Sequence, residues 1–159
     1  EALAARIAQA HPQWRGFGLA VQAYQTRALA VVDEVARIAQ THGLRFMVRL
    51  VKGAYWDGEV KRAQELGLAG YPVFTHKHHT DISYLSCAKA LIDASDVIYP
   101  QFATHNAGTI AAILQMAARP AGVAGHKVWV VKRSAQVKEE PAKRASRRTG
   151  AAPSFETRP

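Results

Sequence analysis

The stretch Arg49-Leu-Val-Lys-Gly-Ala-Tyr-Trp-Asp57 decides the fold class, because an apolar strand runs directly into glycine, alanine and two aromatic residues. The apolar run 45–51 has the length of a buried strand. Alternation along it sets two faces apart, with Met47, Arg49 and Val51 on one and Val48, Leu50 and Lys52 on the other. A guanidinium inside such a strand is costly without a partner. Arg49 therefore either pairs with a carboxylate of a neighbouring strand or faces a ligand.

Outward from this stretch, strand and helix patterns alternate along the first 118 residues. Strands are expected at 17–24, 45–51 and 97–102, and helices at 26–42, 57–66, 80–92 and 106–116. This alternation predicts a parallel sheet with helical crossovers. Polar groups at all three strand ends, and no Gly-x-Gly-x-x-Gly turn, favour part of a TIM-like (β/α)8 barrel over a doubly wound sheet.

The helix boundaries follow from capping residues. Gly43 and Gly67 are placed to end the first two helices, while Asp57, Thr80 or Asp81, and Asn106 are candidate N-caps. Apolar stripes at helical spacing are expected to face the sheet: Leu29, Val32, Val35, Ala36 and Ala39 in one helix, Val60, Ala63 and Leu66 in the next, and Ile82, Leu85, Ala88 and Ile92 in the third.

The charge is distributed unevenly over the 159 residues. Of the net charge of +9, most belongs to residues 119–159, which hold 10 Lys/Arg against 3 Asp/Glu. Residues 1–118 hold 11 against 9 and form the predicted partial barrel. The basic tail 119–159 cannot bury enough apolar surface to order itself, so we predict that it is disordered. Within it only 127–131 resembles a strand.

Two further function classes follow from single features. The basic tail would suit a nucleic-acid-binding module, although its confinement to one quarter of the chain argues against this. The cluster His76, His78, His79 and Asp81, with His105 at the next strand end, would suit a metal-dependent barrel hydrolase. Lys77 interrupts that cluster and would repel a divalent cation, so we expect an anion-facing loop and no metal site. One cysteine, Cys87, fits a reducing, cytoplasmic compartment.

Several long runs resemble the proline dehydrogenase domain of the bifunctional proline-utilisation flavoenzymes. The runs are 18–24, 49–57, 70–73, 80–81, 83–85, 88–89 and 98–106. The resemblance implies a barrel that binds FAD at its strand ends and oxidises L-proline to 1-pyrroline-5-carboxylate. It also implies hydride transfer to the flavin N5, and electron delivery to a membrane quinone at the inner membrane. An aldehyde dehydrogenase module accompanies this domain in the family.

The resemblance also implies a set of site residues. Arg49, near the flavin N5, and Tyr55, facing both flavin and proline, are the catalytic candidates. The cofactor-binding candidates are Gln22, Arg49, Val51, Gly53, Ala54, Tyr55, Trp56, Thr75, His76, Lys77, Thr104, His105 and Asn106. His76 stands where the family often has arginine. The family's substrate-side lysine and acid, and the paired arginines and glutamate that hold the proline carboxylate, have no match, so we expect an inactive fragment. The similarity ends abruptly after Met116 in the Arg-rich tail 119–159, so we predict that this tail is the product of a reading-frame shift.

Overall fold

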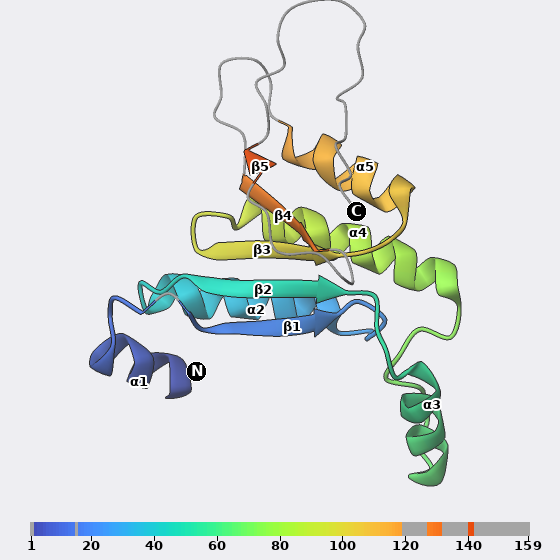
Figure 1. Cartoon of the computed structure of the whole chain (residues 1–159). Coiled ribbons are helices and arrows are strands. Elements are labelled where there is room, and N and C mark those ends of the chain that lie inside the picture. Colours follow the sequence, from blue (N-terminus) through green and yellow to red (C-terminus); the bar gives the residue numbers. More distant parts are fainter. Residues whose placement is uncertain (1, 15, 119–126, 132–139, 142–159) are drawn as a thin grey trace, which may run out of the picture.

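The computed structural model describes residues 2–14, 16–118, 127–131 and 140–141. In chain order its elements are α1 (Ala2–Ala10), β1 (Gly18–Gln22), α2 (Ala28–Thr41), β2 (Phe46–Val51), α3 (Trp56–Glu65), α4 (Lys77–Asp93), β3 (Ile98–Ala103), α5 (Ala107–Ala117), β4 (Lys127–Val131) and β5 (Glu140–Pro141). The strand expected at 127–131 is present as β4 (Figure 1). Apart from β4 and β5, the basic tail that we predict to be disordered lies outside the described residues.

The strands form one sheet in sequence order, β1-β2-β3-β4-β5. The first four are parallel and β5 is antiparallel to β4. In register, Val21 lies beside Leu50, and Leu50 beside Phe102, while Ala20, Arg49 and Gln101 form the adjacent row. The expected α/β class with a parallel sheet is confirmed. A sheet in strict sequence order has no reversal of winding, which a doubly wound sheet requires.

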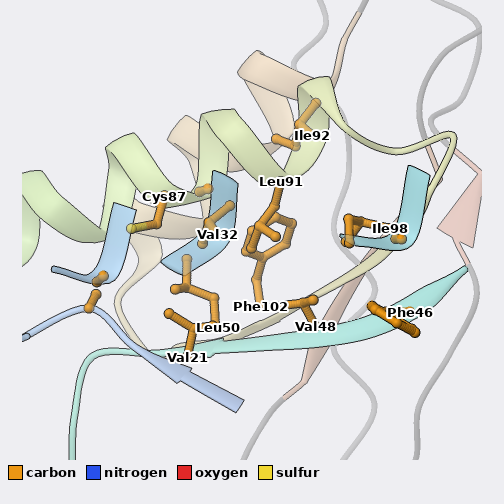
Figure 2. Packing of buried hydrophobic residues seen from close by; sticks show 14 of the residues in the cluster. Val21, Val32, Phe46, Val48, Leu50, Cys87, Leu91, Ile92, Ile98 and Phe102 are labelled. Atoms are coloured by element: carbon orange, nitrogen blue, oxygen red, sulfur yellow. The ribbon is translucent and has the colours of Figure 1, made fainter. Parts of the chain in front are cut away.

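The core lies between one face of this sheet and the helices. Figure 2 shows Leu50, Val48 and Phe102 pointing from the strands toward Leu91 and Ile92 of α4. Burial alternates along β2, where Phe46, Val48 and Leu50 are buried and Arg49 is exposed. The alternation predicted for this strand is therefore confirmed. Burying each large aliphatic or aromatic side chain contributes about 1.5–3 kcal/mol, so this interface holds the strands in place.

The helix predictions were correct in position and partly wrong in detail. Gly43 and Gly67 follow α2 and α3 with φ of 61° and 60°. Asn106 caps α5, its Oδ1 accepting from the Thr109 backbone N–H at 2.9 Å. Asp57 is not an N-cap, because α3 begins at Trp56 and places it in the first turn. Nor do Thr80 and Asp81 cap a helix, since α4 begins one turn earlier at Lys77.

The predicted apolar stripes contain three residues that face solvent. Leu29, Leu66 and Ile82 are 42%, 61% and 62% exposed. In α4 the sheet-facing residues are Tyr84, Cys87, Ala88, Leu91 and Ile92. The buried stripe of α4 therefore runs through Tyr84 and Cys87, and Ile82 lies outside it. In α3 the only buried residue is Ala63, since this helix projects away from the sheet beyond the end of β2 (Figure 1).

Candidate functional site

The carboxyl ends of β1 and β2 are joined by backbone hydrogen bonds beyond the regular strands. The Ala23 and Tyr24 amides donate to the Val51 and Lys52 carbonyls, each at 2.8 Å. The Phe74 amide in turn donates to the Tyr24 carbonyl at 2.8 Å. The loop after β1, the loop after β2 and the segment before α4 are therefore fixed to one another. Parallel strands meet their following loops at one edge, where α/β proteins bind ligands.

A cleft of about 360 Å³ opens at this edge. Its lining comes from all three segments: Tyr24, Lys52, Gly53, Trp56, Phe74, Thr75, Lys77, Thr80 and Asp81. Four of the residues predicted from the resemblance thus lie in its wall: Gly53, Trp56, Thr75 and Lys77. The volume is at the lower end of the roughly 300–1,000 Å³ typical of small-molecule sites.

Gly53 forms the tightest backbone contact in the cleft wall. Its φ is 141°, a conformation that residues with a Cβ rarely adopt. A Cβ at this position would lie 2.4 Å from Cδ2 and 2.5 Å from Cγ of Tyr24. The glycine is therefore required by the Tyr24 ring, which packs against its backbone. A ligand that enters the cleft also meets bare backbone here.

The Tyr24 hydroxyl is buried and lacks a hydrogen-bond partner among the described residues. The residue is only 3% exposed. Burial raises the pKa of Tyr24, and the nearby Glu59 carboxylate raises it further. The Tyr55 backbone N–H lies near enough to oppose this rise in the pKa, yet in a geometry short of a hydrogen bond. A buried hydroxyl without a partner costs about 1–3 kcal/mol, so an orphaned polar group lies in the wall of a ligand-sized cleft.

Two lysines in the wall of the cleft share one carboxylate. Lys52 Nζ and Lys77 Nζ both donate to Asp81, the latter at 2.7 Å to Oδ2. Hydrogen bonds from Lys52 and then Lys77 lower the pKa of Asp81, so the carboxylate is charged at neutral pH. Lys52 Nζ also lies 5.8 Å from the centroid of the Tyr84 ring. The group carries a net positive charge and faces the cleft.

Trp56 lines the cleft, and the histidine cluster lies at the start of α4. The Trp56 indole N–H donates to the Phe74 carbonyl at 2.8 Å, which fixes the start of α3 to the segment before α4. His76 precedes the first residue of α4, and its ring stacks 5.4 Å from that of His78. The His78 and His79 ring centroids are 4.3 Å apart. Thr75 is exposed beside them.

Arg49 lies on the other side of β2, away from the helices. It is exposed, and among the described residues no carboxylate pairs with it. Its neighbours in register are Ala20 and Gln101, so the alternative of a structural ion pair with a neighbouring strand is not found in this part of the chain. Val51 is half-buried on the same face. The guanidinium is thus free to meet a ligand on the face that the helices leave open.

Gln22, Ala54 and Tyr55 connect that open face to the cleft. The Ala54 amide donates to Gln22 Oε1 at a long 3.4 Å. Tyr55 is 72% exposed and precedes the first residue of α3. A large aromatic side chain so exposed at the edge of a site is available to cover a ligand.

The third strand end carries Thr104, His105 and Asn106. Thr104 is buried, and its Oγ1 accepts from the Asn106 amide at 3.2 Å. His105 is exposed. The Tyr84 hydroxyl donates to the Ala103 carbonyl at 3.3 Å, and its ring underlies Lys52. Tyr84 therefore links this strand end to the lysine pair.

Metal ligation finds no support in the described part of the chain. There, no three His, Cys, Asp or Glu side chains are grouped so that they could hold a metal ion. The metal-hydrolase alternative thus lacks a ligand set. The nucleic-acid alternative rests on the tail, most of which lies outside the described residues. No described helix is long and apolar enough to span a membrane.

Comparison with known proteins identifies the family. A family model described as proline dehydrogenase matches residues 1–133. The chain belongs to the proline dehydrogenase family. The bifunctional protein PutA of Escherichia coli is 58% identical over 104 residues, which is 65% of this chain and 8% of that protein. PutA of Rhizobium meliloti is 55% identical over 107 residues, 67% of this chain and 9% of that protein.

Solved structures agree with this assignment. A crystal structure of Bradyrhizobium japonicum proline utilization A superimposes with a TM-score of 0.72 at 52% identity, covering 82% of this chain and 13% of that one. The resemblance to the proline-utilisation proteins is thereby confirmed. The chain spans under a tenth of the length of the curated relatives named above, so the activity of a whole proline dehydrogenase is a proposal for it.

Five residues of the cleft wall were absent from the site set that the resemblance implied: Tyr24, Lys52, Phe74, Thr80 and Asp81. Tyr24 lies within a run that resembles the family, and Lys52 was placed at a strand end. The spacing of Lys77 and Asp81, four residues apart on a helix, is the signal that could have found the ion pair. That signal was obscured because the helix was expected to begin at Thr80 or Asp81.

Proposed function

We propose that residues 17–118 form the cofactor-binding part of a proline dehydrogenase, which oxidises L-proline to 1-pyrroline-5-carboxylate with FAD. The observation that carries this proposal is a cleft at the carboxyl edge of a parallel sheet, with Arg49 exposed nearby on the open face of β2. Membership of the proline dehydrogenase family supplies the reaction class.

The strand order supports a (β/α)8 barrel as the complete fold. The buried residues of β1, β2 and β3 all lie on the helix-covered face. The opposite face carries the row Ala20, Arg49 and Gln101, which in a closed barrel would point inward. Barrel enzymes bind their ligands above this interior, on the loops that follow the strands. A closed barrel of this type has eight strands, so we expect proline turnover only where these residues form part of one.

The described residues fit a dinucleotide cofactor. Gly53 offers bare backbone, Tyr24 a buried hydroxyl without a partner, and Lys52 and Lys77 a net positive charge. Phosphate groups need cationic or N–H donors, and an aromatic side chain such as Trp56 can cover a flat ring. A bound FAD would supply the hydride acceptor for the substrate carbon next to nitrogen.

The roles of the remaining residues follow from their positions. Arg49 would donate hydrogen bonds to the flavin where negative charge develops on reduction, because the N–H groups of its guanidinium lie in one plane with a fixed geometry. Tyr55 would cover flavin and proline. The contacts to the rest of the cofactor would come from Gln22, Val51, Gly53, Ala54, Trp56, Thr75, His76, Lys77, Thr104, His105 and Asn106.

The parent protein of such a segment would have further partners. We propose that it carries an aldehyde dehydrogenase module, since the relatives named above are called bifunctional. We further propose a cytoplasmic protein that transfers electrons to a membrane quinone while in peripheral contact with the inner membrane.

Titration of the full chain with FAD, followed by flavin fluorescence, tests the cofactor assignment. We expect saturable binding that Arg49→Met weakens by about tenfold or more, since a hydrogen bond to a charged group contributes roughly 1.5–3 kcal/mol. Lys89→Met is the matched control, because it removes a positive charge from the remote end of α4. No binding by the unmodified chain, or equal loss in both variants, would contradict the proposal.

A further inference from the structure

Lys52 and Lys77 in the wall of the cleft share a single carboxylate partner, Asp81. Lys52 comes from the loop after β2, and Lys77 from the first turn of α4, yet both donate to Asp81. Their side chains are 28% and 83% exposed, and that of Asp81 is 36% exposed. Without the carboxylate, two ammonium groups would repel each other, and Lys77 would move freely in solvent.

Asp81 is positioned by the buried part of α4. Asp81 lies one turn before Tyr84, which is fully buried and whose hydroxyl bonds to the end of β3. The Tyr84 ring in turn lies under Lys52. The carboxylate and one of its two lysines are thus tied to the strand ends, while the cleft leaves their outer side open.

We propose that Asp81 is a positioning residue that holds Lys52 and Lys77 together as a paired cation site for the phosphate groups of the cofactor. The inference rests on the proposed function and deepens it. A ligand that meets a pair of fixed cations loses less side-chain freedom on binding than one that must order two free lysines. Two lysines with one aspartate leave a net positive charge for a pyrophosphate.

The sign of the effect separates positioning from simple charge. Asp81→Asn adds one positive charge to the site, so attraction alone would tighten binding of an anion. If the carboxylate positions the lysines, the same change weakens binding. The helix offers a matched control: Asp93→Asn breaks the Lys89–Asp93 pair at the far end of α4 with the same change in charge.

The test compares FAD, ADP and riboflavin by calorimetric titration of the full chain. We expect Asp81→Asn to weaken ADP and FAD by about tenfold and to leave riboflavin unchanged, because riboflavin carries no phosphate. Asp93→Asn should change none of the three. In a Lys77→Met background, the Asp81→Asn effect should shrink, since one of the two lysines that the carboxylate positions is then absent.

The outcomes separate this inference from the proposed function. Failure of the unmodified chain to bind FAD or ADP would overturn both. Normal FAD binding with equal or tighter ADP binding by Asp81→Asn would overturn the positioning role alone. Equal weakening of riboflavin would also overturn it, because the carboxylate would then act through the fold. Circular dichroism and urea unfolding of each variant establish that the compared chains are folded.

Discussion

Replacing Gly53 with alanine is the sharpest perturbation of the cleft wall. The new Cβ would lie 2.4 Å from the Tyr24 ring, a distance at which ring or backbone must move. The φ of 141° adds strain of about 1–3 kcal/mol. Displacing a well-packed ring costs a further 1–3 kcal/mol or so. We expect Gly53→Ala to lower the free energy of unfolding by roughly 2–6 kcal/mol.

Two other glycines distinguish the backbone strain from the clash with the Tyr24 ring. Gly67 has a φ of 60° and open space around it, so Gly67→Ala should cost only the backbone strain, about 1–2 kcal/mol. Gly58 lies inside α3 with no neighbour within 4 Å and no positive φ. Gly58→Ala should therefore stabilise the chain by about 0.5–1 kcal/mol.

Urea unfolding gives the free energy of unfolding of all three variants, provided that the dependence of that free energy on urea concentration is the same in each. The reasoning predicts a loss at Gly53 that exceeds the loss at Gly67, and a gain at Gly58. A Gly53→Ala variant as stable as Gly67→Ala would show that the Tyr24 ring does not pack against residue 53.

Other predictions follow from single side chains. Tyr24→Phe removes a buried hydroxyl without a partner and should leave stability unchanged or raise it, whereas Tyr84→Phe breaks a bond to Ala103 and should cost about 0.5–1.5 kcal/mol in urea unfolding. Asn106→Ala removes the α5 cap and should lower the free energy of unfolding by about 1 kcal/mol, whereas Asn106→Ser should keep most of that stability because serine can also cap. Equal losses in the two variants would argue against capping. The lowered pKa of Asp81 contributes stability that is present above about pH 4 and is lost as the pH falls through that lowered pKa. The free energy of unfolding measured from pH 6 to 3 should therefore fall less steeply in Asp81→Asn than in the unmodified chain. Parallel pH profiles of the two chains would contradict this.

The sequence was sufficient for the strands and their faces because apolar runs end abruptly at glycine and polar residues. Val48 and Leu50 are buried and Arg49 is exposed, as period-two alternation predicts. The cap at Asn106 was also predictable, because an asparagine directly precedes an apolar helix. Local patterns determine these features, so they can be identified without knowledge of the tertiary contacts.

Contacts between distant segments were beyond such patterns. The start of α4 was set one turn late, because nothing in the histidine-rich segment marks Lys77 as helical. Ile82 was assigned to the core because it is apolar, although Tyr84 and Cys87 occupy the face toward the sheet. The Lys52–Asp81 contact joins residues 29 positions apart and needs the fold to be seen.

A chimera tests the central claim most directly. The 104-residue stretch of E. coli PutA that matches this chain would be replaced by the corresponding residues of this chain, so that they lie in a complete enzyme. Proline-dependent dye reduction would then be measured, with Arg49→Met in the chimera as control. We predict a chimera that binds FAD and oxidises proline, with much of that activity lost in Arg49→Met. A folded chimera without proline turnover, or one in which Arg49→Met has no effect, would contradict the account.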